Sequence, residues 1–123
     1  MYRIFVEDHF SAAHRLRHYK GKCERVHGHN WKIRVFVSGM APDPQDGMIM
    51  DFGLLKGHLR EVLSLFDHQD LNALELFATE EPSAENIARI VFQAMAPRID
   101  NDHRRVSQVM VWESEASCAI YEE

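Results

Sequence analysis

The run His27-Gly28-His29 leads directly into a segment of alternating apolar and polar residues, and this combination constrains the fold more than any other feature of the chain. From Asn30 to Ser38, isoleucine and valine recur at every second position, which is typical of a β-strand with one buried face. Successive side chains of a strand point to opposite faces, so residues two apart share a face. We therefore expect His27 and His29 to point the same way, with Gly28 leaving room for another backbone or a ligand.

Segments with strand character lie at both ends of the chain, and two amphipathic helices are predicted between them. The predicted strands are Tyr2–Phe10, Asn30–Ser38, Val106–Trp112 and Cys118–Tyr121. Asp51 is expected to cap a first helix, whose apolar stripe extends from Leu55 to Phe66. Ser83 is expected to cap a second helix, which Pro97 should end because proline lacks a backbone N–H.

This order of elements, with strands at both ends and helices in the middle, predicts the α+β class. The expected architecture is one domain over residues 1–123, with a four-stranded antiparallel sheet and two helices in the order ββααββ. Residues 42–47 have the composition of a turn, in which Gly47 can adopt a positive φ. Because four strands and two helices leave part of the sheet uncovered, we expect an oligomer.

Charge and hydropathy exclude some classes of partner. The net charge of −5 argues against a nucleic-acid partner, because duplex binding usually needs a basic face. No run of residues reaches the ~20 apolar positions that a membrane span needs, and the first residues do not resemble an export signal. We therefore expect a cytoplasmic protein in which Cys23 and Cys118 are free thiols.

Three histidines, His14, His27 and His29, are candidate metal ligands. His14 can reach the other two from the first strand or from the loop after it. A zinc ion held by three imidazoles keeps a fourth position open, and this open position is where catalytic zinc does its chemistry. Judged by spacing alone, a pair of ordinary surface histidines is an equally good interpretation.

Three further residues and one pair have side chains that could transfer protons, bind a substrate or orient a metal ligand. Cys23 has basic neighbours that would lower its pKa and make it a usable base, although a lone cysteine is often only a small buried residue. In Asp67-His68 the carboxylate could orient the imidazole for proton transfer, or the histidine could stabilise a helix end. Glu113 could accept paired N–H donors from a guanidine-like ring edge, or be solvated in a turn. Asp51 could orient a ligating histidine, although helix capping explains it better.

Seven short stretches, taken together, are specific for one family. They are Phe10–Leu16, Cys23–His29, Met50–Phe52, Asp67-His68, Leu71-Asn72, Pro82–Glu85 and Val111–Ser114. In these stretches the chain resembles the 6-pyruvoyl-tetrahydropterin synthase family, and most of all its bacterial branch in queuosine biosynthesis. The stretches follow one another in family order, so the resemblance covers essentially the whole chain.

The resemblance implies the tunnelling fold (T-fold), with two helices on one face of the sheet. It also implies that several subunits join their sheets into a barrel, as a hexamer of two stacked trimers with active sites at subunit interfaces. The implied site residues are the zinc ligands His14, His27 and His29, the catalytic base Cys23, the relay Asp67 and His68, and the pterin anchor Glu113. The family often draws the relay from a neighbouring subunit.

The implied substrate is 7,8-dihydroneopterin triphosphate. In the queuosine branch the products are 6-carboxy-5,6,7,8-tetrahydropterin, acetaldehyde and triphosphate. Zinc would lower the pKa of the side-chain hydroxyls of the substrate as a Lewis acid, and Cys23 and His68 would move protons. From charge and proximity alone, Arg15, Lys22 or Arg25 could hold the triphosphate.

The stretch before His27 decides between branches of the family. The interval between Cys23 and His27 is three residues, which is similar to the queuosine branch, whereas the 6-pyruvoyl enzymes tend to carry a longer insertion. Glu24 leaves a second activity open, because some members use a glutamate three residues before His-Gly-His to form a 6-hydroxymethyl pterin for folate synthesis. The 6-pyruvoyl reaction is a further alternative, and a non-catalytic zinc- or pterin-binding module is an alternative of a different class.

Overall fold

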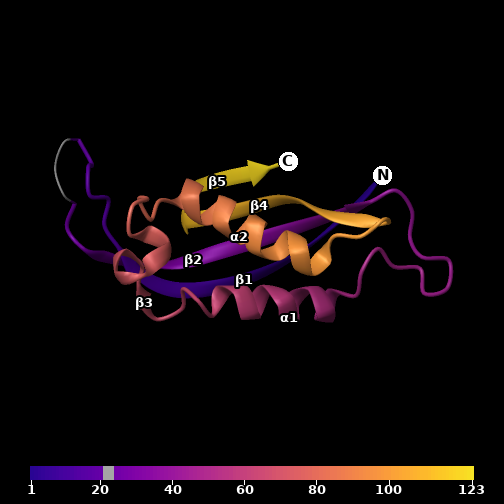
Figure 1. The fold of residues 1–123 in the computed structure, drawn as a ribbon. Coiled ribbons are helices and arrows are strands. Elements are labelled where there is room, and N and C mark those ends of the chain that lie inside the picture. Colours follow the sequence, from indigo (N-terminus) through magenta and orange to yellow (C-terminus); the bar gives the residue numbers. More distant parts are fainter. Residues whose placement is uncertain (21–23) are drawn as a thin grey trace.

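The computed structural model describes residues 1–20 and 24–123, which form one sheet with two helices packed on it (Figure 1). The strands are β1 (Tyr2–His14), β2 (His27–Gly39), β3 (Gln69–Asp70), β4 (Arg104–Ser114) and β5 (Ser117–Glu122). The helices are α1 (Phe52–Leu63) and α2 (Ala84–Ile99), with short 3₁₀ turns η1 (Leu71–Ala73) and η2 (Glu75–Phe77) between them. The α+β prediction is therefore confirmed.

The sheet has five strands, in the order β3-β1-β2-β4-β5, whereas the sequence predicted four. The additional strand β3 has two residues and pairs with β1 in parallel, with Ala12 opposite Gln69 and Ala13 opposite Asp70. The sheet is therefore mixed, and the prediction of an antiparallel sheet holds only for β1, β2, β4 and β5. Two residues are too few to show an alternating pattern, so only contact with β1 identifies β3 as a strand.

The first two strands are longer than predicted, and the extra residues carry the histidines. β1 extends four residues beyond Phe10 to His14, and β2 begins at His27. The antiparallel pairing runs without interruption from Tyr2 opposite Gly39 to His14 opposite His27. Alanine has little preference for strands, but Ala12 and Ala13 lie opposite His29 and Gly28 of β2. The hydrogen bonds of this pairing hold both alanines in β1.

The helices begin at the predicted caps, but the second one ends later than predicted. The Asp51 carboxylate accepts the N–H of Leu54 at 2.8 Å, and Ser83 accepts the N–H of Asn86 at 3.2 Å. The prediction that Pro97 ends the helix was wrong, because α2 continues to Ile99. Proline removes the donor to the Gln93 carbonyl, but Gln93 is exposed and water can satisfy that oxygen, while Ile99 is buried and holds the last turn.

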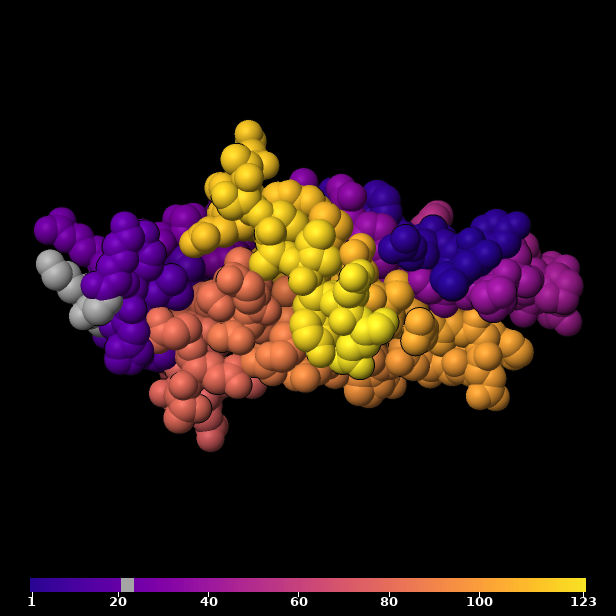
Figure 2. All heavy atoms as spheres, turned by 90° about the horizontal axis from the view of Figure 1, so that it is seen from above, coloured from indigo at the N-terminus to yellow at the C-terminus, as the bar shows by residue number. Residues whose placement is uncertain are grey.

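The core lies between the helices and one face of the sheet. Its largest fully buried side chains include Trp31, Phe10, Phe66, Leu55 and Leu59. The molecule is elongated along the strands, and Figure 2 places residues 15–20 and the segment around residue 45 at opposite ends. Gly47 in the second of these segments has φ +74°, as its turn composition predicts. No helix in the described part of the chain is long and apolar enough to cross a membrane.

Replacing Leu59 with alanine should destabilise the protein by about 2–5 kcal/mol, because it empties a fully buried position in α1. Leu54→Ala is the matched control on the same helix, since Leu54 is 53 % exposed and its loss should change stability by less than about 0.5 kcal/mol. Denaturant unfolding followed by circular dichroism measures both. Equal losses for the two variants would contradict the placement of the core.

Candidate metal centre and active site

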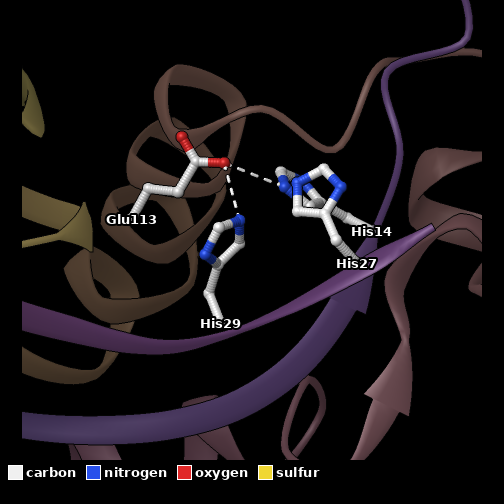
Figure 3. A group of neighbouring side chains, drawn as sticks. All are labelled: His14, His27, His29 and Glu113. Atoms are coloured by element: carbon white, nitrogen blue, oxygen red, sulfur yellow. Dashed lines mark ion pairs between the residues drawn. The ribbon is translucent and has the colours of Figure 1, made fainter. Parts of the chain in front are cut away.

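Three imidazoles meet at one end of the sheet, on the face that the helices cover (Figure 3). His14 is the last residue of β1, and His27 and His29 are the first and third residues of β2. Their ring centroids lie 4.7 to 5.1 Å apart. The buried indole of Trp31 packs edge-on against His14 and His29, at 4.8 and 5.3 Å between ring centroids. The structure therefore brings together the three residues that the sequence singled out as metal ligands.

Glu113 joins this cluster from the end of β4. The pairing of β4 with β5 is irregular between Trp112 and Ser114, so Glu113 lies in a bulge. A bulge re-aims the side chain of the extra residue. One carboxylate oxygen lies 2.9 Å from Nε2 of His14 and 3.0 Å from Nε2 of His29 (Figure 3). Together with His27, these residues offer four ligand atoms that all lie within 4.8 Å of one another, close enough to hold a metal ion.

Backbone carbonyls select the ring nitrogens that face the cluster. Nδ1 of His14 donates to the carbonyl of Pro82 at 2.7 Å, and Nδ1 of His27 donates to the carbonyl of Arg25 at 2.8 Å. In a neutral imidazole this leaves Nε2 with a free lone pair, which is the form that binds a metal. Nε2 of His14 and of His29 is buried and makes no aligned hydrogen bond, in spite of the nearby Glu113. A metal ion would supply the partner that these two buried nitrogens lack.

Burial lowers the pKa of His29, and charge on His14 or His27 would lower it further, whereas the Glu113 carboxylate opposes this shift. A lowered pKa keeps the imidazole neutral, as a metal ligand must be. The cluster therefore suits a divalent cation in both geometry and charge.

Asp67 and His68 lie apart from the cluster, against the edge of β1. The N–H of Ser11 donates to the Asp67 carboxylate at 3.0 Å, and the N–H of His68 donates to the carbonyl of Ser11 at 2.6 Å. The Ser11 N–H lowers the pKa of Asp67, and the neighbouring His68 lowers it further. Nδ1 of His68 lies 3.0 Å from the carboxylate, while the imidazole is 83 % exposed. The pair thus has the geometry of an oriented histidine that points to solvent rather than toward His14.

The backbone of His68 has φ +58°, in the left-handed region that residues other than glycine rarely adopt. His68 and His29 both border an open hollow of about 380 Å³ over the edge of the sheet. Neither Asp67 nor His68 contributes to the group of ligand atoms around His14. The structure therefore separates the predicted relay from the predicted metal ligands of the same chain.

Of the other predicted site residues, Glu24 lies near the histidines, whereas Arg15 and Arg25 are exposed. Glu24 accepts the N–H of Leu16 at 3.2 Å, and its carboxylate lies 3.9 Å from Nε2 of His27. Arg15 is anchored through its backbone N–H and carbonyl to the side chain of Asn72, and its own side chain is exposed. Arg25 is also exposed. Cys23 and Lys22 lie outside the described residues.

Glu113 also borders a hollow of about 290 Å³ beside the metal ligands. The hollow lies between the start of α2 and the β4–β5 hairpin, where Ala84, Glu85, Ser117 and Cys118 line it. Cys118 is a free, exposed thiol, as the sequence predicted. Partial loss of hydration at its sulfur raises the pKa of this thiol. A planar ring that enters the hollow would meet the Glu113 carboxylate at the edge of the cluster.

Sequence patterns did not reveal the groups that hold the histidines in place. The carbonyls of Pro82 and Arg25 fix two imidazoles, and a carbonyl is present in every residue, so no residue type marks this role. The sequence places Pro82 in a stretch that resembles the family, but it does not predict that the carbonyl of Pro82 bonds His14. A hydrogen-bonded carbonyl of this kind is visible only in three dimensions.

The fold and the site define an α+β protein with a cluster of three histidines and one glutamate that can bind a metal ion. The family model for 6-pyruvoyl tetrahydropterin synthase matches residues 3–123. The chain therefore belongs to the 6-pyruvoyl tetrahydropterin synthase family, and the predicted resemblance is confirmed.

Relatives and solved structures agree with this assignment. The chain is 40 % identical over 96 residues to 6-carboxy-5,6,7,8-tetrahydropterin synthase of Synechocystis, which covers 75 % of this chain and 73 % of the relative. It is 30 % identical over 145 aligned residues to the protein of the same name from Haemophilus influenzae, over the full length of both. The structure of Caenorhabditis elegans 6-pyruvoyl tetrahydropterin synthase superposes with a TM-score of 0.84 at 28 % identity, covering 99 % of this chain and 95 % of the other. The predicted T-fold is therefore confirmed.

Proposed function

We propose that this protein is a zinc-dependent 6-carboxytetrahydropterin synthase of queuosine biosynthesis. Its substrate is 7,8-dihydroneopterin triphosphate, and its products are 6-carboxy-5,6,7,8-tetrahydropterin, acetaldehyde and triphosphate. The observation that carries the proposal is the convergence of three imidazoles, two of which are fixed at Nδ1 by backbone carbonyls while the ring of the third packs edge-on against Trp31. The two bacterial relatives described above, which bear this name, support the choice of product.

His14, His27 and His29 hold the metal in this proposal, because their Nε2 atoms converge and two of them are buried without a hydrogen-bond partner. A zinc ion bound there supplies a Lewis acid that lowers the pKa of the substrate hydroxyls. Glu113 lies at the edge of the cluster and borders the adjacent hollow. Its carboxylate accepts the paired N–H groups of the pterin ring and orients the side chain of the substrate toward the histidines.

The acid–base groups come from two places. Cys23 accepts a proton from the substrate, a role that rests on the family resemblance. Asp67 orients His68, which returns a proton, and the 83 % exposure of the His68 side chain supports a role in the site of a neighbouring subunit. This arrangement requires an oligomer, and we propose the hexamer of two stacked trimers that the resemblance implies, acting in the cytoplasm. Arg15, Arg25 and Lys22 are the candidates to hold the triphosphate, and the exposed side chains of Arg15 and Arg25 are free to do so.

Incubation of the purified zinc protein with 7,8-dihydroneopterin triphosphate, followed by mass spectrometry of the products, tests the proposal. A 6-carboxy pterin formed together with acetaldehyde supports it. A 6-pyruvoyl product would instead assign the chain the activity for which the Caenorhabditis elegans relative is named. The absence of any product from a zinc-loaded protein would leave only a binding module.

Glu24 favours one second candidate activity, the formation of a 6-hydroxymethyl pterin. Its carboxylate lies 3.9 Å from Nε2 of His27, so it can reach a substrate at the histidines and act as an alternative proton acceptor. The same incubation reports this activity as a second product. Glu24→Gln should then remove the 6-hydroxymethyl product and keep the 6-carboxy product.

Glu113→Gln should raise KM for the substrate about 10- to 100-fold, because a hydrogen bond to a charged partner contributes about 1.5–3 kcal/mol. Metal affinity should stay close to that of the wild type if Glu113 anchors the pterin. Glu115→Gln is the matched control, since Glu115 is exposed in the same hairpin. Steady-state kinetics and a zinc titration separate the roles: loss of metal with unchanged KM would make Glu113 a fourth metal ligand instead.

A further inference from the structure

His14 depends for its orientation on a segment far away in the sequence. Its Nδ1 lies 2.7 Å from the carbonyl of Pro82, 68 residues later. His14 is 2 % exposed and Pro82 is also buried, so no water can replace this acceptor easily. The direction of the Pro82 carbonyl therefore sets both the tautomer and the tilt of the His14 ring.

Arg17 holds the chain that precedes Pro82. Its guanidinium donates to the carbonyl of Phe77 at 2.6 Å and to the carbonyl of Glu80 at 3.0 Å. Its backbone N–H donates to the carboxylate of Glu81 at 2.5 Å. Arg17 follows β1 by three residues, so these bonds tie the segment before Pro82 to the strand end that carries His14.

Asn86 holds the same segment from inside α2. Its side-chain amide donates to the carbonyl of Glu81 at 2.8 Å, and its backbone N–H donates to the hydroxyl of Ser83 at 3.2 Å. The peptide group before Pro82 is thus held by the Asn86 side chain, and the side chain of Ser83, the residue after Pro82, is held by the backbone of the same Asn86. Arg17, which precedes this segment in the sequence, and Asn86, which follows it, thus both hold the backbone that leads to the carbonyl of Pro82.

We propose that Arg17 and Asn86 are positioning residues for the metal ligand His14, acting through the carbonyl of Pro82. This inference rests on the proposed metal site. Without either residue the carbonyl is free to turn, and His14 loses the acceptor that orients Nε2 toward the other imidazoles. A direct outer partner of a metal-ligating histidine, here the Pro82 carbonyl, typically changes metal affinity about 10- to 100-fold; because Arg17 and Asn86 act one step further out, we expect the lower end of that range, about 10-fold.

The variants Arg17→Met and Asn86→Asp test the proposal. The Asn86→Asp change keeps the backbone N–H that bonds Ser83 but removes the amide donor to Glu81. Arg98→Met is the matched control, because Arg98 also joins two segments, pairing with Glu61 of α1, and its bonds lie away from residues 80–83. The zinc dissociation constant, measured by competition with a chelator, and the absorption spectrum of the cobalt-substituted protein report the site itself. Thermal unfolding of the metal-free protein reports any general loss of stability.

Arg17→Met and Asn86→Asp should bind zinc about 10-fold more weakly and alter the cobalt spectrum, whereas Arg98→Met should change neither, even if all three variants unfold at lower temperature. Wild-type zinc affinity in both test variants would overturn the inference. If Arg17→Met does not fold, the zinc dissociation constant of Asn86→Asp alone supports or overturns the inference. Failure of the proposed metal site is distinguishable, because then His14→Ala would bind zinc as well as the wild type.

Discussion

His29→Ala is expected to weaken zinc binding about 10²- to 10³-fold and to abolish turnover at ordinary metal concentrations. A structural zinc site with four protein ligands contributes about 10–16 kcal/mol of apparent binding free energy, or about 2.5–4 kcal/mol per ligand, and we expect a loss of this size for one of the three histidines, since each 1.4 kcal/mol is a tenfold change. Nε2 of His29 is buried without a hydrogen-bond partner, and alanine at this position of β2 offers no ligand atom.

The control for this experiment is His9→Ala. His9 is an exposed histidine of β1 that lies outside the cluster of ligand atoms. Chelator competition measures the zinc dissociation constant of both variants, and substrate turnover is followed in parallel. A His29→Ala protein that retains the wild-type dissociation constant would show that the three imidazoles do not share an ion.

Cys23→Ala is expected to lower kcat by about 10²- to 10⁴-fold, the usual contribution of a positioned acid–base group, while leaving zinc binding intact. Alanine removes the thiolate that the family resemblance assigns as the base, and it removes none of the three histidines. The experiment therefore separates loss of a proton acceptor from loss of the metal.

Cys118→Ala provides the comparison in kcat for the other thiol of the chain, which lies on β5 and lines the hollow beside Glu113, so its KM can change although its kcat should not. Rapid-mixing kinetics with 7,8-dihydroneopterin triphosphate, together with the zinc content of each protein, give the comparison. Unchanged turnover in Cys23→Ala would remove the base from the proposal and would favour Glu24, whose carboxylate is near His27. Zinc loss in Cys23→Ala would assign the thiol to the metal instead.

The predictions that held rest on patterns within a few residues of one another. Asp51 and Ser83 cap their helices because each side chain bonds an N–H three residues later, which a sequence shows directly. His27 and His29 share a face because they are two apart on a strand. The buried stripe of α1 follows in the same way from the spacing of its leucines and valine.

The predictions that failed involve residues whose partners lie far away in the chain. Pro97 stays helical because buried Ile99 holds the last turn in the core. Strand β3 exists only because Gln69 and Asp70 lie beside β1. Both outcomes depend on packing between segments, which a pattern of neighbouring residues does not contain.

The relay proposed for Asp67 and His68 rests on the pairing of a carboxylate with an imidazole and on the family resemblance. Their contacts with Ser11 put both residues at the edge of the sheet, apart from the imidazole cluster of the same chain. Because Ser11 is more than fifty residues away from this pair, its role as their partner has no signal in the local sequence.

Local sequence thus determined most of the four longer strands, the helix starts and the shared face of His27 and His29, because backbone geometry repeats over two to four residues. The tertiary structure alone decided that His14 meets them, that Glu113 turns toward them from a bulge, and that the carbonyl of Pro82 orients His14. These contacts join residues separated by tens of positions. Their geometry depends on strand register and helix packing, which come from the burial of the whole core and cannot be read from neighbouring residues.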